Sequence, residues 1–477
     1  MKINYKIVLV IIFLLTLAFR LYISFTNTSF SSDDSYFNLR VTNYIIDNKR
    51  PLIYDDLSYS GRTLVYPQAF NVFLAVFSFI PSYEKIIPAL LISSIVFIVY
   101  LISKKISNNV KVSLFMALTA AFIPIEIKTN VNQISVYSLV IPIILLMILA
   151  LLNLDQKRYF NLFVILSFLL PLIHPISFLF AFSLLFYLIL INTESINIDK
   201  SKKEAVAFSF FIILVINFFL YKSALIKYGT NIIWQSIPQN LFSVYFQTFN
   251  IIEILYLLGF IPLILGIIGI YSGIFRKKEE SMILLGSFLL ATLILVSLKL
   301  INLQIALLFI SLPLLIASSK SLKDIYDYFT ITKFDKLERY FDITLLVLIV
   351  IASIIPAIII GLNLPNYNQE INTFSWVREN SNKDSIILAP LEFGNILTYI
   401  SERKNVLDDN FLLAPNSNER IEDIGIIYKT PFEVKGLELI KKYNINYIYI
   451  PSNLTIPYIN DEKCFEMVNQ DVQKVKC

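Results

Sequence analysis

The sequence predicts a polytopic α-helical membrane protein with about eleven transmembrane helices and a small α/β domain at its C-terminal end. Hydrophobic residues make up 56% of the 477 residues and charged residues only 16%, whereas soluble domains usually carry about 25% charged residues. The apolar residues fall in blocks near the roughly 20 residues that a helix needs to cross a bilayer. The segment after residue 362 has no such block and alternates short apolar runs with polar stretches.

The apolar blocks predict the transmembrane helices in chain order. We expect spans at 7–25, 86–103, 112–127, 135–152, 160–173, 176–192, 204–221, 251–274, 281–298, 303–318 and 342–362. The first run resembles a signal peptide, but it is long and no small-x-small cleavage site follows it, so we expect it to be retained. One further stretch, 68–81, is short and has polar flanks, which favours an interfacial or re-entrant helix.

Basic residues predict the orientation of these helices. Lysine and arginine cluster in the loops on the N-terminal side, at 104–111, 200–203 and 276–278, and are sparse in the opposite loops. Because cytoplasmic loops carry such an excess, we expect a cytoplasmic N-terminus. If 68–81 crossed the membrane, this bias would invert for every later loop. The net charge of +5 is too small to suggest nucleic-acid binding.

This orientation predicts a protein of the cell membrane with two domains, one transmembrane and one external. We expect a transmembrane domain over residues 1–362, with external loops at 26–85 and 222–250, and an external α/β domain over 363–477. In the external domain we expect strands at 384–389, 405–407 and 446–450, and helices at 391–401, 419–428 and 431–443. Strands that alternate with helices suggest a parallel sheet.

The two cysteines, Cys464 and Cys477, both lie near the C-terminus. If this tail is extracytoplasmic, a disulfide between them is plausible. Two free thiols in a frayed tail are an equal alternative. The spacing fits no zinc ligand set.

Two adjacent carboxylates, Asp33 and Asp34, follow the first span within ten residues and so lie near the membrane surface. Adjacent carboxylates repel each other unless a cation or base shares the site. This arrangement suits a divalent metal ion, or a general base that faces a lipid-borne substrate. The alternative is a solvated loop in which Asp34 caps the following helix, 36–46.

The loop that contains these aspartates resembles a known family. Its motif is Asp34-x-Tyr36-Phe37-Asn38-x-Arg40, then Asp55-Asp56, Gly61-Arg62 and Tyr66-Pro67. Its order and spacing are similar to the first external loop of oligosaccharyltransferase catalytic subunits, which are membrane glycosyltransferases of the GT-C type. The tail is similar as well, at 376–380, 385–394, 402–410 and 442–450. The resemblance covers the first 150 residues and about 370–450, and it implies a GT-C fold with a horizontal helix after Tyr66-Pro67.

The resemblance implies an activity and a set of roles. It implies transfer of a sugar or oligosaccharide from a polyprenyl (dolichyl) phosphate or diphosphate to a protein or glycan acceptor on the outer face. Asp34 would be the catalytic acid that binds a divalent cation (Mg or Mn) and the acceptor amide, with Asp33 assisting. Arg40 and Arg62 would be structural or would face the donor phosphate, since a guanidinium fork suits phosphate. Tyr36 would contact the acceptor.

Three motifs depart from the family pattern. The Trp-Trp-Asp-Tyr-Gly motif that grips the acceptor reads Pro390-Leu391-Glu392-Phe393-Gly394, which leaves Glu392, Phe393 and Gly394 as acceptor-binding candidates. The segment expected to carry a second acidic motif, 128–135, has no acid. Asn302 and Gln304 stand where the family has a basic donor-binding residue.

Other residues could substitute for these losses. Glu126, at the outer end of a span, could replace the missing acid near Asp34, or it could be an interfacial carboxylate paired with Lys128. Lys128 and His174 could bind the donor phosphate, His174 as an imidazolium; a helix-end histidine facing interfacial water is the alternative. Arg20 could reach the interface by snorkelling or line a substrate cavity.

Three functions remain open on the sequence. A transferase accounts for the Asp34 motif. A non-catalytic paralogue that binds a glycolipid or a protein partner accounts for the lost motifs. A transporter of polyprenyl-linked sugars is disfavoured because the sequence shows no symmetric halves and no broken helices.

Overall fold

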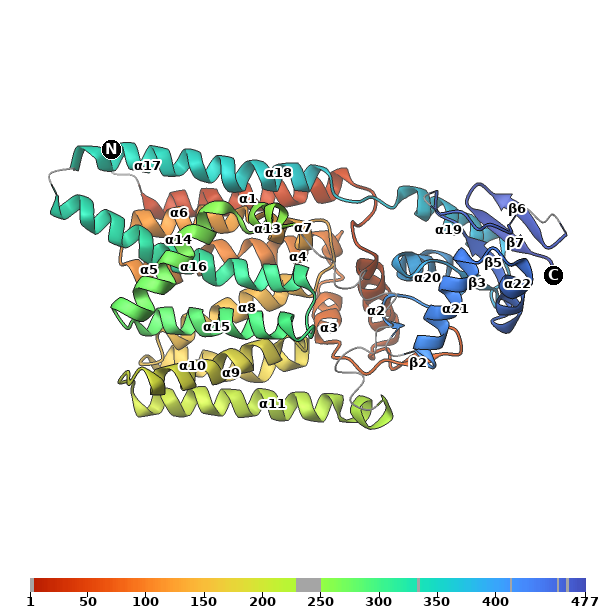
Figure 1. Cartoon of the computed structure of the whole chain (residues 1–477), viewed down its shortest axis with the longest axis horizontal. Helices are drawn as coiled ribbons and strands as arrows, with labels where there is room; N and C mark the ends of the chain where they lie inside the picture. The colour runs from red at the N-terminus through yellow and green to blue at the C-terminus, as the bar shows by residue number, and fades with distance from the viewer. Residues whose placement is uncertain (1–3, 229–249, 333–334, 412–413, 453, 460–462) are drawn as a thin grey trace.

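Figure 1 shows the computed structural model of the chain, which describes residues 4–228, 250–332, 335–411, 414–452, 454–459 and 463–477. Most helices run side by side along the long axis and form a bundle. A small domain with a five-stranded sheet lies at one end of the bundle, and α2 (Asp33–Asn48) and α3 (Ala69–Val76) lie between the two. The predicted first external loop and the predicted external domain therefore share one end of the molecule.

In the described part of the chain, six helices are long and apolar enough to cross a membrane. They are α1 (Tyr5–Thr26), α4 (Tyr83–Ser93) continued by α5 (Ile95–Ser107), α11 (Lys200–Tyr228), α15 (Glu280–Ser297), α16 (Leu303–Ile331), and α17 (Asp335–Ile349) continued by η3 (Val350–Ile354) and α18 (Ile355–Leu362). The molecule is therefore built mainly from membrane-length helices, as the composition predicts.

Two helix pairs are bent, and they raise the number to eight if each pair is one span. The pairs are α6 (Val110–Ala121) with α7 (Pro124–Asn130), bent by 42°, and α13 (Ile251–Leu258) with α14 (Phe260–Tyr271) and η2 (Ser272–Arg276), bent by 84°. Pro124 starts α7, because proline suits the first helical turn and disfavours helix in the residue before it. Gly259, with φ of 80°, separates α13 from α14, a conformation that glycine adopts without strain.

Three predicted spans are shorter helices, namely α8 (Tyr137–Leu151), α9 (Lys157–Ile173) and α10 (Ser177–Thr193). At 1.5 Å per residue they extend only about 22 to 26 Å, less than the roughly 30 Å of a hydrocarbon core. Every predicted span thus contains a helix, but a count of eleven crossings stays a prediction. Helix α3 is only about 12 Å long, too short to cross, as the sequence predicts for 68–81.

Ion pairs join the basic loops at the end of the bundle away from the sheet (Figure 1). Lys202 Nζ lies 2.5 Å from Glu280 Oε1, and Lys278 Nζ lies 3.0 Å from Glu194 Oε2. These loops are ones that the charge pattern assigns to a single side. The second predicted external loop, 222–250, lies largely outside the described residues.

The C-terminal domain is built on a mixed sheet with strand order β4-β3-β5-β7-β6. Its strands are β3 (Ile386–Leu388), β4 (Lys404–Asn405), β5 (Ile445–Tyr449), β6 (Phe465–Asn469) and β7 (Val472–Val475), and its helices are α19 (Asn368–Asn380), η4 (Leu391–Phe393), α20 (Gly394–Ser401), α21 (Ser417–Lys429) and α22 (Glu433–Lys442). The three predicted strands pair in parallel, as expected. The antiparallel hairpin β6–β7 and helix α19 were not predicted.

A disulfide joins Cys464 to Cys477 across this hairpin, with the Cα atoms 4.8 Å apart. The two residues flank strands β6 and β7, whose pairing aligns Phe465 with Val475. Of the two alternatives for these cysteines, the disulfide is the one that the structure contains.

We expect the double substitution Cys464→Ser/Cys477→Ser to lower the stability of the C-terminal domain by about 3 kcal/mol, the chain-entropy value for a loop of about 15 residues. Urea-dependent proteolysis of the domain measures this change, and reduced wild-type protein is the matched control. Free thiols in unreduced protein from intact cells, detected with a maleimide reagent, would contradict the expectation.

The first external loop is bound to the edge of the sheet. Strands β1 (Tyr54–Asp55) and β2 (Arg62–Thr63) form a small hairpin. Between them, the Tyr59 N–H donates to the Asn405 carbonyl at 2.8 Å and the Asn405 N–H donates to the Leu57 carbonyl at 2.9 Å. The loop thus extends edge strand β4, which fixes the C-terminal domain relative to the bundle end.

Candidate active site

Asp34 lies in the first turn of α2, between the helix bundle and the C-terminal domain. The helix begins at Asp33, so Asp34 is not the cap of a helix that starts near residue 36. Its side chain is exposed, and no hydrogen bond or ion pair among the described residues engages its carboxylate. The surrounding protein and the charge of Asp408 raise the pKa of Asp34. A carboxylate that solvent reaches and whose pKa is raised is suited to accept a proton.

Asp33 faces the other way, into the protein. It is 5% exposed, and its carboxylate accepts three hydrogen bonds. The donors are Nδ2 of Asn395 at 2.7 Å, the Asn395 N–H at 3.2 Å and the Ile396 N–H at 2.8 Å. The structure therefore separates the two adjacent aspartates, and only Asp34 presents a free carboxylate.

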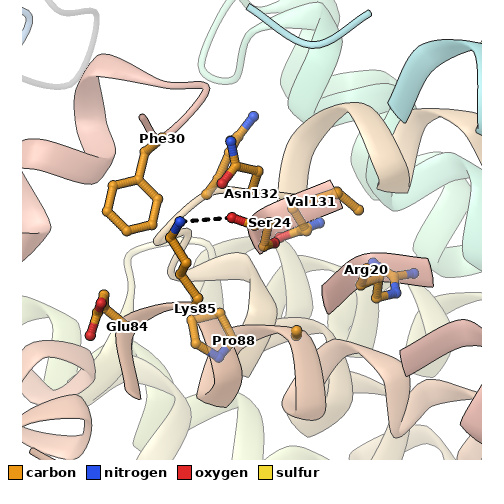
Figure 2. A pocket seen from close by; sticks show the side chains of 11 residues that line it. Arg20, Ser24, Phe30, Glu84, Lys85, Pro88, Val131 and Asn132 are labelled. Carbon is orange, nitrogen blue, oxygen red and sulfur yellow. Dashed lines mark hydrogen bonds between the residues drawn. The ribbon is translucent and has the colours of Figure 1, made fainter. Parts of the chain in front are cut away.

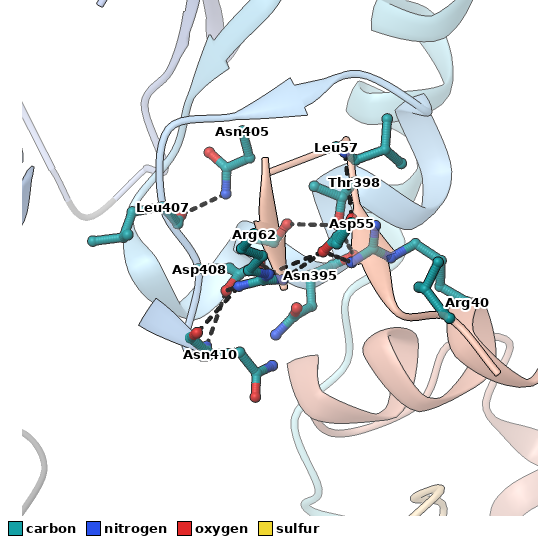
Figure 3. A network of polar contacts seen from close by, with 12 residues as sticks. Arg40, Asp55, Leu57, Arg62, Asn395, Thr398, Asn405, Leu407, Asp408 and Asn410 are labelled. Carbon is teal, nitrogen blue, oxygen red and sulfur yellow. Dashed lines mark hydrogen bonds and ion pairs between the residues drawn. The ribbon is translucent and has the colours of Figure 1, made fainter. Parts of the chain in front are cut away.

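A chain of alternating charges joins the first loop to the C-terminal domain (Figure 3). Arg40 donates to both oxygens of Asp55 at 2.7 and 2.8 Å. Nε of Arg62 donates to Asp55 at 3.0 Å, while its two other nitrogens donate to Asp408 at 2.5 and 2.7 Å. Arg62 also donates to the Asn410 carbonyl at 3.2 Å.

This network decides between the two roles predicted for Arg40 and Arg62. Arg62 is 2% exposed and every nitrogen of its guanidinium donates to a protein oxygen. Arg40 binds Asp55 with a bidentate fork. The paired arginines hold the pKa of Asp55 down, to about 2. The structural role is the one the contacts support, and the donor-phosphate role would require breaking these ion pairs.

The C-terminal domain contributes two further carboxylates, Asp409 and Glu392, and the charges of Asp34 and Glu392 both act on Asp409. Burial raises the pKa of Asp409 well above its ordinary range, and the charges of Asp33, Asp34, Asp408 and Glu392 raise it further. Glu392 is exposed, and partial desolvation raises its pKa. The acidic residues of the loop and of the C-terminal domain therefore share one region.

The predicted acceptor segment borders this region. Phe393 packs its ring on Tyr367 and Tyr449, with centroids 6.1 and 5.4 Å away. Gly394 starts α20 against Asp408, where a Cβ atom would lie 2.5 Å from the Asp408 Cβ. A Cβ atom does not fit there, which explains sterically why residue 394 is a glycine.

Tyr36 packs inside the loop. It is 3% exposed, its hydroxyl accepts from the Phe30 N–H at 3.1 Å, and its ring contacts Tyr367 and Tyr399. The predicted contact with an acceptor would therefore involve little of this side chain.

Glu126 forms a buried ion pair with Arg20, 106 residues away in the sequence. Both carboxylate oxygens bind the guanidinium, one at 2.9 Å from Nη1 and the other at Nη2. Glu126 is 0% and Arg20 1% exposed. Arg20, rather than the predicted Lys128, is the ion-pair partner, and Lys128 Nζ lies 3.8 Å from Glu253 Oε1. No described contact joins Glu126 to Asp34, and a role for Glu126 in place of the missing acid stays a prediction.

A small hollow of about 10 Å³ lies beside this ion pair, between α1, α4 and residues 130–133 (Figure 2). Lys85 crosses it and donates to the Ser24 carbonyl at 2.7 Å. Three buried polar atoms of its lining, Arg20 Nε, Asn130 Oδ1 and Asn132 Oδ1, have no hydrogen-bond partner among the described residues. One donor and two acceptors suit a neutral polar group better than an ion.

His174 ends α9 and points its ring at Tyr137, with centroids 5.2 Å apart. Its Nδ1 accepts the Ile176 N–H at 3.1 Å. An imidazolium carries protons on both ring nitrogens, so this hydrogen bond requires a neutral ring. Binding of the donor phosphate by His174 stays a prediction.

A divalent cation prefers several oxygen ligands around it. The described residues bring together no group of three or more His, Cys, Asp or Glu side chains that could hold a metal ion. We therefore assign no step to the predicted cation.

Sequence reasoning missed Asn395, Asp408 and Asp409 as parts of the site. Asp408 and Asp409 lie in a segment that resembles the family, but only their contact with the loop gives them a role. No local pattern marks Asn395, because its partner Asp33 lies 362 residues away.

No protein-family model and no curated protein sequence matches this chain. Its fold matches solved structures. An oligosaccharyltransferase from Archaeoglobus fulgidus in the apo form has a TM-score of 0.72 at 14% identity, covering 94% of this chain and 69% of that one. The same enzyme tethered to an acceptor peptide with the NVT sequon has a TM-score of 0.74 at 13% identity, covering 93% and 68%.

A second kind of protein matches over nearly its whole length. ArnT from Cupriavidus metallidurans bound to undecaprenyl phosphate has a TM-score of 0.55 at 9% identity, covering 98% of this chain and 97% of that one. Such low identities establish a common fold only. The chain thus shares its fold with the Archaeoglobus fulgidus oligosaccharyltransferase and with ArnT.

Proposed function

We propose that this chain is a membrane glycosyltransferase that moves a sugar or oligosaccharide from a polyprenyl (dolichyl) phosphate or diphosphate to a protein or glycan acceptor on the extracytoplasmic face of the cell membrane. The observation that carries the proposal is the free, exposed carboxylate of Asp34 between bundle and C-terminal domain. Structures of similar fold support the substrate class, since one holds dolichol-phosphate with an inhibitory peptide and another undecaprenyl phosphate.

In the proposed reaction, Asp34 accepts a proton from the acceptor nitrogen or oxygen as that atom bonds to the anomeric carbon of the sugar. The bond between that carbon and the phosphate oxygen breaks, and its electron pair leaves with the lipid phosphate. Asp34 then releases the proton to solvent. In this proposal the acceptor lies beside Glu392 and Phe393.

The proposed orientation places the N-terminus in the cytoplasm and the C-terminal domain outside, with about eleven crossings. The clustering of basic loops at one end and the disulfide at the other support this orientation.

Asp34→Asn is expected to reduce glycan transfer by about 10²- to 10⁴-fold, the usual contribution of a positioned proton acceptor. Transfer is measured in membranes that contain a radiolabelled pool of polyprenyl-linked sugar. The matched control is Asp47→Asn, the same change at an exposed position on the same helix, which should transfer like the wild type. Equal transfer by Asp34→Asn and wild type at equal expression would rule out the assigned role.

The transfer rate is expected to rise with pH and then level off. The pKa of Asp34 is raised, so the carboxylate stays protonated to a higher pH than an ordinary aspartate and cannot accept a proton below that point. The apparent midpoint belongs to the acidic group as a whole, because the charge of Asp34 also raises the pKa of Asp33 and of Asp409. A pH profile of kcat tests this expectation. In Asp34→Asn, the increase of kcat with pH should be absent. A wild-type kcat that falls with increasing pH would contradict the expectation.

The second candidate function is a non-catalytic protein that binds a glycolipid or a protein partner. The absence of an acid in 128–135 favours it. Transfer by the wild type no greater than in membranes without the protein, together with binding of labelled lipid-linked sugar, would support this candidate over the transferase.

A further inference from the structure

Asp33 and Asp34 are adjacent in sequence but face different surroundings. Both lie in the first turn of α2, where successive side chains point about 100° apart. Asp34 is exposed to solvent, whereas Asp33 is 5% exposed and faces the C-terminal domain.

Asp33 caps the N-terminus of α20, a helix of the C-terminal domain. Its carboxylate accepts from the backbone N–H groups of Asn395 and Ile396 and from the Asn395 side chain. N–H groups in the first turn of a helix have no partner within the helix, and the Asp33 oxygens accept from two of those of α20. Within the described residues, Asp33 thus does for α20 what a capping residue does, but from the first external loop.

The helix that Asp33 fixes begins directly after the acceptor candidates. Residues 391–393 form the short helix η4, and Gly394 is the first residue of α20. Gly394 packs against Asp408, and Asp408 forms an ion pair with Arg62. Any shift of the start of α20 would therefore move Glu392 and Phe393 relative to Asp34.

We propose that Asp33 is a positioning residue that ties residues 392–394 to the loop carrying Asp34, so that an acceptor held by that segment lies next to the proton-accepting carboxylate. This inference rests on the proposed function. The neighbouring aspartates divide two tasks, with Asp34 facing the reacting groups and Asp33 setting the distance from them to the acceptor segment.

Hydrogen exchange of the full-length protein in detergent tests the contact without any substrate. In Asp33→Asn, the amides of residues 394–398 should exchange about tenfold faster, because asparagine replaces one of the two accepting oxygens with an NH2 group that cannot accept. Asn395→Ala, which removes one of the three bonds from the opposite side, should change exchange in the same direction by less. Asp34→Asn and Glu402→Gln, the latter at the far end of α20, should leave these amides unchanged.

Enzyme kinetics separate a positioning role from a catalytic one. The acceptor is a fluorescent peptide that carries Asn-Val-Thr, and the donor is lipid-linked sugar extracted from source membranes. Asp33→Asn should raise the KM for the peptide about tenfold and leave kcat unchanged, whereas Asp34→Asn should lower kcat. This pattern distinguishes lost binding from a lost transition-state interaction. Unchanged exchange in Asp33→Asn, or a loss of kcat equal to that of Asp34→Asn, would overturn the proposal. A wild type that transfers nothing to any acceptor, with exchange behaving as expected, would contradict the proposed function and not the Asp33 contact.

Discussion

Arg62→Met is expected to destabilise the C-terminal domain and its attachment by about 3 to 5 kcal/mol, the usual cost of leaving a buried charge without its partner. The side chain is buried and holds Asp55 of the loop and Asp408 of the domain together. Without it, Asp408 has lost both of its guanidinium bonds and Asp55 keeps only Arg40. Urea-dependent proteolysis of the domain measures the loss.

The control for this prediction is Arg378→Met in the same domain. Arg378 pairs with Glu402 at 2.6 Å, but both side chains are about half exposed, at 52% and 55%. Exposed ion pairs contribute about 0 to 1 kcal/mol, so this variant should resemble the wild type. Arg62→Lys should recover only part of the loss, because an ammonium cannot form two bidentate contacts. Equal stability of Arg62→Met and Arg378→Met would contradict the assigned role.

Glu126→Leu is expected to destabilise the helix bundle by about 3 to 5 kcal/mol, since it leaves the Arg20 charge buried and unpaired. The two side chains join α1 to α7 and are almost fully buried. The double variant Arg20→Met/Glu126→Leu should recover most of this stability, because a buried ion pair can often be replaced by apolar residues at little cost. Thermal unfolding of the detergent-solubilised protein measures both.

Lys128→Met is the control on the same helix. Its ammonium is 35% exposed and lies 3.8 Å from Glu253, so its loss should change stability by about 1 kcal/mol or less. A double variant as unstable as Glu126→Leu alone would show that the pair does more than neutralise two buried charges.

The sequence carries most of the information about the helices and little about their contacts. Apolar blocks mark the spans because each helix must bury its backbone polar groups within one segment. Hydropathy alone merges α13 with α14 into one predicted span, because it does not show the backbone break at Gly259. The hairpin β6–β7 escaped prediction because its short strands carry several exposed and half-exposed residues and lack a clear apolar period.

The location of the site could be predicted from the sequence, but the hydrogen bonds and ion pairs within it could not. The adjacent carboxylates marked the first loop, yet nothing in their sequence tells that Asp33 binds α20 while Asp34 stays free. That difference arises from helix geometry and from a partner 362 residues away. The same holds for Glu126, where the near neighbour Lys128 was a natural choice but the buried Arg20 is the partner.

The most direct test of the proposed transferase uses purified protein in liposomes that contain a polyprenyl-phosphate-linked sugar with a radiolabelled sugar. Cleavage of the bond between sugar and phosphate, with label leaving the lipid fraction for an added acceptor, is the result the account predicts, and it should depend on Asp34. Label that stays on the lipid while the protein binds it would contradict the account and leave a glycolipid-binding protein.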